Sequence, residues 1–408
     1  MPPPPGPAPK SAKGQPPPAP RSQSRRASTS RGKRRASVTD KKEKRPSDLS
    51  GVELHDTTGA AFDEVQDSRW GFDSEPPKWV LKGITMDNGG CLMDTDKFFT
   101  SKATTLEVHH RTYDPSSASS RHVFLFHALH EHCNKFSYQV LADQLGKGGA
   151  TVHGLDMQAH GHSDEFDTQF IADYEDLVAD AIQWIELTLE NRDSHTFQFV
   201  SHCEGSAICF LLQSMMQDST SPMAKYADRF RGHYALAPMI SYHPISSAHY
   251  GILQCVATVL PCFCASSKMF STERKRHTKP WMVFQTRKAK TLEVTLDPLA
   301  WEQDVPLQTE KTIYDLCTEV RKVIMDISSP VKLVHGSHDE VIPFRGSQWM
   351  AKNFAYGRDK KLEDVFWKLP EERHVIMVGN FGQLLFDDIV KWTQDRAMDR
   401  THLVNPMV

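Results

Sequence analysis

The sequence has 408 residues, of which 39% are hydrophobic, and a formal net charge of −3. A chain of this length and apolar content can bury a sizeable core, so its composition excludes a wholly disordered chain and predicts a soluble globular protein of one large domain or two ordinary ones. The eight cysteines show no framework spacing, which favours reduced thiols over disulfides.

The first 50 residues differ sharply from the rest. They carry 11 of the 25 prolines and 13 Lys or Arg against 3 Asp or Glu. We therefore predict a disordered, basic, Pro-rich tail and linker over residues 1–75. The tail has a charge of about +10 and the remainder about −13. Two roles of the tail are compatible with this charge: a plain solvated tail, or contact with an acidic surface. Nothing in it resembles a folded nucleic-acid reader, so we expect no nucleic-acid partner.

Two short repeats lie in this tail, because residues 25–28 and 34–37 both read Arg-Arg-Ala-Ser. The repeat is similar to substrates of basophilic kinases such as the cyclic-AMP-dependent family, so Ser28 and Ser37 are candidate phosphorylation sites; a chance match is the alternative. No apolar run follows the basic residues, which argues against a secretory signal peptide and leaves an organelle transit peptide as an alternative. We expect a cytoplasmic protein.

Beyond the tail, short β-rich runs alternate with helical patterns. This alternation predicts an α/β fold with a mostly parallel central sheet flanked by helices. The predicted strands cover residues 105–110, 123–126, 151–155, 197–200, 234–237, 331–334 and 365–369. Apolar residues at helical spacing over 170–185 predict one amphipathic helix. We place the whole domain at residues 76–400.

Residues at about 240–310 break the alternation and predict an inserted helical cap. An apolar run covers 251–264, but it is shorter than about 18 residues and contains Gln254 and Pro261, so it is unsuited to a membrane span. The alternatives are a lid helix over an apolar pocket, able to contact a membrane peripherally, and an ordinary buried helix.

The sharpest local signal is the abrupt change from the strand at 197–200 to a helix a few residues later. Such an elbow holds its central residue at an unfavourable backbone angle and requires small residues two before and two after it, which Ser201 and Gly205 provide. The tip is Cys203, where a helix N-terminus and a neighbouring imidazole favour the nucleophilic thiolate. A packing cysteine in a fold that has lost catalysis is the alternative.

Candidates for an acid and a base follow the elbow in chain order. Asp339 lies in a glycine-containing loop after the strand at 331–334, and His374 follows the strand at 365–369. A carboxylate fixed at a strand end can accept the histidine Nδ1 proton, so this order predicts Cys203, Asp339 and His374 as a catalytic triad. Glu340 is the alternative acid.

An oxyanion hole is predicted where the strand at 123–126 ends and the elbow helix begins. Backbone N–H groups at these two places point at the carbonyl oxygen of the reacting acyl group. We expect the first donor from Ala128 or Leu129 and the second from Glu204.

Several motifs resemble the monoacylglycerol lipase and lysophospholipase group of α/β-hydrolases, which is related to the serine aminopeptidase-type hydrolases. The segment 127–132, His-Ala-Leu-His-Glu-His, is similar to the group's His-Gly-x-x-Glu-His, and 156–163 is similar to its Asp-x-x-Gly-His-Gly-x-Ser loop. The Asp-Pro-Leu at 297–299 sits where the group has a similar tripeptide after its cap. The resemblance spans about residues 80–400 and implies the α/β-hydrolase fold.

Three positions depart from the group's pattern. Cys203 replaces the nucleophilic serine, Ser201 the first elbow glycine and Ala128 the oxyanion glycine. The cysteine resembles the elbow of dienelactone hydrolases, which act through a thiol. The resemblance implies structural roles, rather than metal binding, for the histidines at 127, 130, 132, 160 and 162.

The resulting hypothesis is hydrolysis of a carboxylic ester, similar to a monoacylglycerol or lysophospholipid, or of a thioester, through an acyl-enzyme on Cys203. The expected partner is a small-molecule acyl ester, and no cofactor is required. A catalytically inactive ligand-binding or signalling protein is the alternative, which the retained acid and base disfavour. Acyl transfer to an alcohol other than water shares the same residues.

Overall fold

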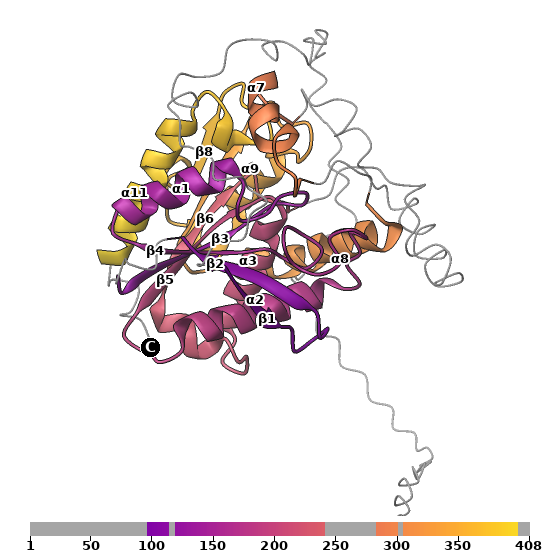
Figure 1. Ribbon diagram of the computed structural model, residues 1–408. Coiled ribbons are helices and arrows are strands. Elements are labelled where there is room, and N and C mark those ends of the chain that lie inside the picture. The colour runs from indigo at the N-terminus through magenta and orange to yellow at the C-terminus, as the bar shows by residue number, and fades with distance from the viewer. Residues whose placement is uncertain (1–95, 114–118, 241–282, 301–304, 399–408) are drawn as a thin grey trace, which may run out of the picture. The chain divides into compact units, whose positions relative to one another are not determined.

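The computed structural model describes residues 96–113, 119–240, 283–300 and 305–398. In this part of the chain eight strands form one sheet in the order β1-β2-β4-β3-β5-β6-β7-β8 (Figure 1). The strands are β1 (Asp96–Thr100), β2 (Glu107–Thr112), β3 (Arg121–Phe126), β4 (Thr151–Leu155), β5 (Thr196–His202), β6 (Phe230–Leu236), β7 (Val331–Gly336) and β8 (Phe366–Leu369). Strand β2 pairs antiparallel with β1 and β4, and all other neighbours pair parallel. The predicted mostly parallel sheet is confirmed.

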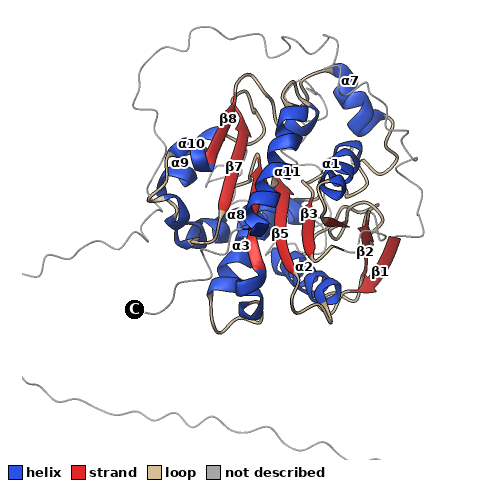
Figure 2. Cartoon of the chain, turned by 90° about the vertical axis from the view of Figure 1, so that its left-hand side faces the viewer, coloured by secondary structure: helices blue, strands red, loops and turns tan. Residues whose placement is uncertain are grey.

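Helices cover both faces of this sheet. They are α1 (Phe136–Lys147), α2 (Tyr174–Leu189), α3 (Glu204–Gln217), α7 (Arg287–Lys290), α8 (Leu307–Val323), α9 (Phe344–Asn353), α10 (Leu362–Val365) and α11 (Gly382–Met398). Short helical turns are η2 (Ala224–Arg229), η4 (Thr291–Thr295), η5 (Ile324–Asp326), η6 (Ala355–Gly357) and η7 (Ile376–Val378). Helices α1 and α11 lie side by side on one face, and α2, α3 and α8 cover the other (Figure 2). The arrangement is the α/β-hydrolase fold.

The core follows from the period of two in the central strands. In β3, Phe124 and Phe126 point to the face covered by α2 and α3, whereas Val123 and Leu125 point to the face covered by α1 and α11. Trp184 of α2 packs edge-on against both phenylalanines, with ring centroids 4.9 and 5.4 Å away. Both faces of β3 are therefore buried, as a central parallel strand requires.

The predicted strands correspond to β2 through β8, with ends that differ by a few residues, and 151–155 matches β4 without a shift. The helix predicted over 170–185 is α2, which begins at Tyr174 because the side chain of Asp173 caps it by accepting the Glu175 N–H. Strand β1 was not predicted. It is an antiparallel edge strand in which Phe99 alone is buried, so its sequence lacks a clear alternation.

The predicted tail and linker, with Ser28 and Ser37, lie outside the described residues, as do 241–282 and 301–304 of the predicted cap. The described part of the cap region holds α7 and the π-helical turn η4. Within the described ranges, each helix is too short or too polar to cross a membrane.

Three histidines form a hydrogen-bonded chain near the amino ends of β3, β4 and β5. His122 Nδ1 lies 2.8 Å from His153 Nε2, and His122 Nε2 lies 2.8 Å from His195 Nδ1. Each contact needs one ring nitrogen with a proton and one without, so the chain suits neutral rings. Burial, with the nearby charges of His195 and Arg192, lowers the pKa of His122 to about 4.

We expect acidification from pH 7 to pH 5 to destabilise the wild-type protein more than the variant His122→Gln. Because the pKa of His122 is about 4 in the folded protein against 6.5 for an ordinary histidine, the unfolded chain binds more protons between these values. Stability therefore falls as the pH drops below 6.5, by at most about 1.4 kcal/mol per pH unit for this ring. Urea unfolding of both proteins at the two pH values measures the difference, and equal pH sensitivity would contradict it.

Candidate active site

The predicted elbow lies between β5 and α3. Cys203 joins them with φ 49° and ψ −111°, a conformation that is strained for any residue with a side chain. Its N–H donates to the Leu236 carbonyl at 2.9 Å, and its own carbonyl accepts the Met239 N–H at 3.0 Å. The end of β6 and the segment that follows it thus hold the turn, with Cys203 at its tip.

Small residues allow the elbow to form. A Cβ at Gly205 would lie 2.6 Å from the carbonyl oxygen of His127, so only glycine fits where α3 passes the end of β3. Serine fits at position 201 because its hydroxyl is hydrogen-bonded to His233 Nε2 at 2.5 Å. His233 Nδ1 faces the amide oxygen of Gln213 at 2.8 Å, so it carries the ring proton and leaves Nε2 to accept the serine hydroxyl.

The surroundings of Cys203 suit either a nucleophile or a packing residue. The residue is fully buried and occupies the N-cap position of α3, where the partial positive charge of the helix N-terminus favours a thiolate. Cys209, further along α3, is also fully buried, and burial raises the pKa of its thiol well above the usual value. Cys209 therefore belongs to the core.

The predicted acid and base meet beyond β7 and β8. Asp339 Oδ2 lies 2.7 Å from His374 Nδ1, and both side chains are fully buried. Asp339 Oδ1 accepts the N–H groups of Val341 and Ile342, each at 2.8 Å. Burial alone would raise the pKa of the Asp339 carboxyl, but the charge of His374 and hydrogen bonds from His335 and His374 hold it well below its usual value. The carboxylate is fixed and ionised beside the ring.

The loop that carries His374 packs against the elbow through His202, the residue before the tip. The two rings have centroids 5.0 Å apart, and His202 Nε2 lies 3.3 Å from the His374 carbonyl oxygen. His202 Nδ1 lies 3.0 Å from Glu131 Oε2, which also accepts the Tyr138 hydroxyl at 2.7 Å. His202 therefore links the base loop, the elbow and the segment after β3.

The segment after β3 carries both candidates for the first oxyanion donor. Ala128 and Leu129 are buried, and the Ala128 N–H donates to Glu131 Oε2 at 3.1 Å. This bond engages the Ala128 amide within the protein, and Ala128 and Leu129 both stay candidates for the first donor. Glu204 is the first residue of α3, where N–H groups have no carbonyl within the helix to bind, and it stays the second candidate.

One histidine from each of the two resembling motifs, His127 and His160, is bonded to backbone groups through both ring nitrogens. His127 Nδ1 donates to the Ala128 carbonyl at 2.8 Å, and its Nε2 accepts the Met157 N–H at 2.9 Å. His160 Nδ1 donates to the Gln158 carbonyl at 2.9 Å, and its Nε2 accepts a backbone N–H at 3.3 Å. Burial lowers the pKa of His127 to about 4 and that of His160 to about 3. Both rings are neutral cross-links between loops.

One cluster in the described ranges has ligand atoms close enough to hold a metal ion, namely His109, Cys133 and Asp156. His109 Nδ1 lies 2.7 Å from Asp156 and its Nε2 lies 3.0 Å from Asp96. Although burial opposes it, hydrogen bonds to these two carboxylates raise the pKa of His109 to about 9. A carboxylate on each nitrogen stabilises a protonated ring, so the geometry fits a buried ion pair better than a metal ligand.

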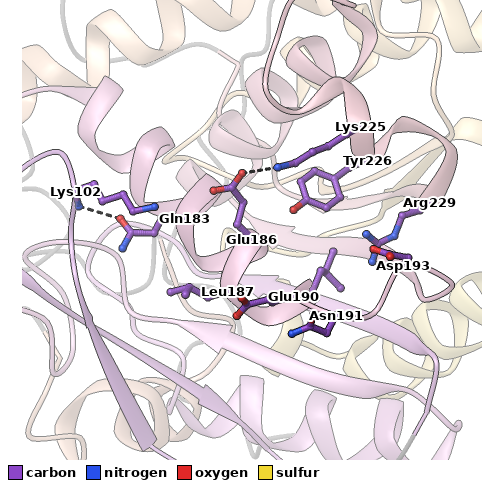
Figure 3. A pocket seen from close by; sticks show the side chains of 11 residues that line it. Lys102, Gln183, Glu186, Leu187, Glu190, Asn191, Asp193, Lys225, Tyr226 and Arg229 are labelled. Atoms are coloured by element: carbon purple, nitrogen blue, oxygen red, sulfur yellow. Dashed lines mark hydrogen bonds and ion pairs between the residues drawn. The ribbon is translucent and has the colours of Figure 1, made fainter.

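Two pockets formed by described residues are compared with the candidate site. The larger, about 610 Å³, is lined by charged residues near the end of α2, where Lys225 bonds Glu186 at 2.8 Å (Figure 3). This pocket lies near the start of β5, about 20 Å from the tip at the strand's other end, so it is separate from the candidate site. The smaller, about 350 Å³, is lined by residues such as Phe166 and Asp297, and Asp297 also bonds His132 at 2.6 Å.

The sequence alone indicates no role for His202 or His335, although both contact the acid and base pair. The available signal was their position, since His202 precedes the tip and His335 lies four residues before Asp339. With 20 histidines in the chain, that signal does not separate them from structural rings.

Comparison with known proteins supports one family. Residues 117–368 match the family model for serine aminopeptidase, S33. A monoacylglycerol lipase of Mycolicibacterium smegmatis is 23% identical over 274 residues, which cover 66% of this chain and 86% of that protein. A monoglyceride lipase of Rattus norvegicus is 21% identical over 255 residues, covering 62% and 76%.

Solved structures share the fold. The crystal structure of a soluble variant of monoglyceride lipase from Saccharomyces cerevisiae, in complex with a substrate analog, superposes with a TM-score of 0.58 at 15% identity, covering 79% of this chain and 99% of that chain. The monoacylglycerol lipase of Paleococcus ferrophilus gives a TM-score of 0.51 at 18% identity, covering 71% and 99%.

Proposed function

The chain belongs to the serine aminopeptidase S33 family, and on this premise we propose that it is a carboxylic ester hydrolase with Cys203 as its nucleophile. The observation that carries the proposal is the buried contact of 2.7 Å between Asp339 and His374, beside an elbow that has Cys203 at a positive φ. The family match ends at residue 368, so the role of His374 rests on this geometry.

In the proposed reaction the Cys203 sulfur attacks the ester carbonyl carbon, and the electron pair of the carbonyl double bond moves to its oxygen. The N–H group of Ala128 or Leu129, together with that of Glu204, stabilises this oxyanion. His374 takes the thiol proton and gives it to the alcohol oxygen as the carbon–oxygen bond breaks, which leaves an acyl-thioester. Water then attacks the thioester, His374 takes its proton and returns it to the departing sulfur, and Asp339 orients the ring throughout.

The expected substrate has one apolar acyl chain and a small polar alcohol, similar to a monoacylglycerol or a lysophospholipid. Two relatives named as lipases of monoacylglycerols support this class. A thioester is the second substrate class, because the same residues would cleave it. We further propose that the protein is cytoplasmic and contacts membranes peripherally through its cap. We also propose that kinases phosphorylate Ser28 and Ser37 in the tail.

We expect the full-length protein to hydrolyse members of a panel of short and long nitrophenyl esters and monoacylglycerols. An electrophilic thiol probe should label Cys203, and labelling should weaken in His374→Ala because the imidazole no longer promotes the thiolate. Mass spectrometry of the labelled peptide and fatty-acid release measure the two outcomes. Inertness toward the whole panel, with equal labelling of both proteins, would favour the inactive ligand-binding alternative.

A further inference from the structure

A second imidazole contacts the oxygen of Asp339 that faces His374. His335 Nε2 lies 2.9 Å from Asp339 Oδ2 and 3.0 Å from the carbonyl oxygen of Ile342. Both of these neighbours are acceptors, so His335 Nε2 carries a proton and donates it. Asp339 Oδ2 thus accepts two hydrogen bonds, one from each ring.

The other nitrogen of His335 is bound by Ser347. The distance from His335 Nδ1 to Ser347 Oγ is 2.7 Å. In a neutral ring with its proton on Nε2, Nδ1 is an acceptor, so the serine hydroxyl donates and fixes the tautomer. His335 lies in β7 and Ser347 in α9, and both are fully buried, so bulk water cannot replace either bond.

Sharing one oxygen between two rings has an electrostatic consequence. A hydrogen bond donated to an ionised carboxylate stabilises its charge. The same bond weakens the attraction of the carboxylate for a proton held on the second ring. The imidazolium of His374 is therefore stabilised less than it would be by Asp339 alone, and a base that must both take and return a proton works best when neither state is too stable.

We propose that His335 is a positioning residue that holds the Asp339 carboxylate in place for His374 and sets the basicity of His374. His335 does not contact the reacting atoms, because Asp339 lies between the two rings. The catalytic meaning of this inference rests on the proposed function, but its two tests below require no turnover.

The first test measures the tautomer of His335 in the wild-type protein. Nitrogen NMR of the full-length chain with ¹⁵N-labelled histidine, assigned by comparison with His335→Gln, should show a proton on Nε2 of His335 at pH 7. A ring with its proton on Nδ1 could not donate to Asp339 and would overturn the inference.

The second test measures the apparent pKa of His374 in two variants. His335→Met removes the donor at similar volume, whereas His335→Gln keeps an N–H close to the position of the ring Nε2. We expect the pKa of His374 to rise by about 0.5 to 1 unit in the methionine variant and to stay near the wild-type value in the glutamine variant. His122→Gln, a buried histidine of β3 bonded to other histidines, is the matched control and should leave it unchanged.

An unchanged pKa of His374 in a folded His335→Met protein would overturn the inference. If His335→Met does not fold, the NMR measurement of the His335 tautomer in the wild-type protein decides whether the inference holds. A shifted pKa with an inert ester panel would keep the role of His335 and reject the proposed hydrolysis. Hydrolysis of the esters with an unshifted pKa of His374 would keep the proposed hydrolysis and reject the role of His335.

Discussion

Replacing Cys203 with alanine is expected to lower kcat for ester hydrolysis by about 10⁴-fold or more, because the acyl-thioester can no longer form. Alanine keeps a Cβ and tolerates the elbow no worse than cysteine, so the loss should appear in kcat and not in folding. Cys203→Ser should alter turnover without abolishing it, because a hydroxyl can take the same position. Steady-state kinetics on the most reactive ester of the panel, with thermal unfolding of each protein, measures both effects.

The matched control is Cys209→Ala. This residue lies in α3, the helix that Cys203 caps, is equally buried and packs in the core cluster formed with α2 and α8. We expect its activity to stay near that of the wild type, with a small loss of stability. Comparable losses in the two variants would trace the effect to the packing of α3. Full activity in Cys203→Ala would mean that another group carries the reaction.

Much of the fold could be predicted because each step depends on local chemistry. Strand β4 is buried throughout, and Gly148 and Gly149 before it and Asp156 after it are turn-forming residues that mark its ends. The elbow needs small residues at two fixed distances from its tip, and Ser201 and Gly205 meet that demand in the sequence itself. Asp339 and His374 could be paired because the carboxyl ends of parallel strands meet at one edge of a sheet, so loops after β7 and β8 lie together.

The network around the candidate site could not be predicted, because its partners are distant in sequence and their residue types are common. His202 meets Glu131 across 71 positions, and no local pattern signals that contact. The hydrogen bond from the Ala128 N–H to Glu131 also has no signal in the sequence. A histidine that bonds a carboxylate and one that bonds a carbonyl also look identical in sequence.

Changing Asp339 to asparagine is expected to lower kcat by about 10⁴-fold while the fold is kept. Asp339 Oδ1 receives two backbone N–H groups, so the amide oxygen of asparagine would take that place. The amide NH₂ would then face His374 Nδ1, which must become an acceptor. It would also replace the oxygen that accepts the Nε2–H of His335, which keeps the Ile342 carbonyl as its acceptor. The ring proton would move to Nε2, and the ring could no longer take the proton of the Cys203 thiol. Kinetics and thermal unfolding of Asp339→Asn test this expectation.

The variant Glu340→Gln tests whether Asp339 or its neighbour Glu340 is the catalytic acid. The Glu340 side chain is 39% exposed and lies 3.5 Å from Arg373, away from any fixed contact with His374, so its loss should leave kcat near the wild-type value. Loss of activity in Glu340→Gln, with wild-type activity in Asp339→Asn, would assign the acid to Glu340.

Because the pKa of Asp339 is held well below its usual value, its carboxylate stays ionised above about pH 4. A loss of wild-type activity between pH 7 and pH 5 must then come from protonation of another group, and in the proposed mechanism that group is His374.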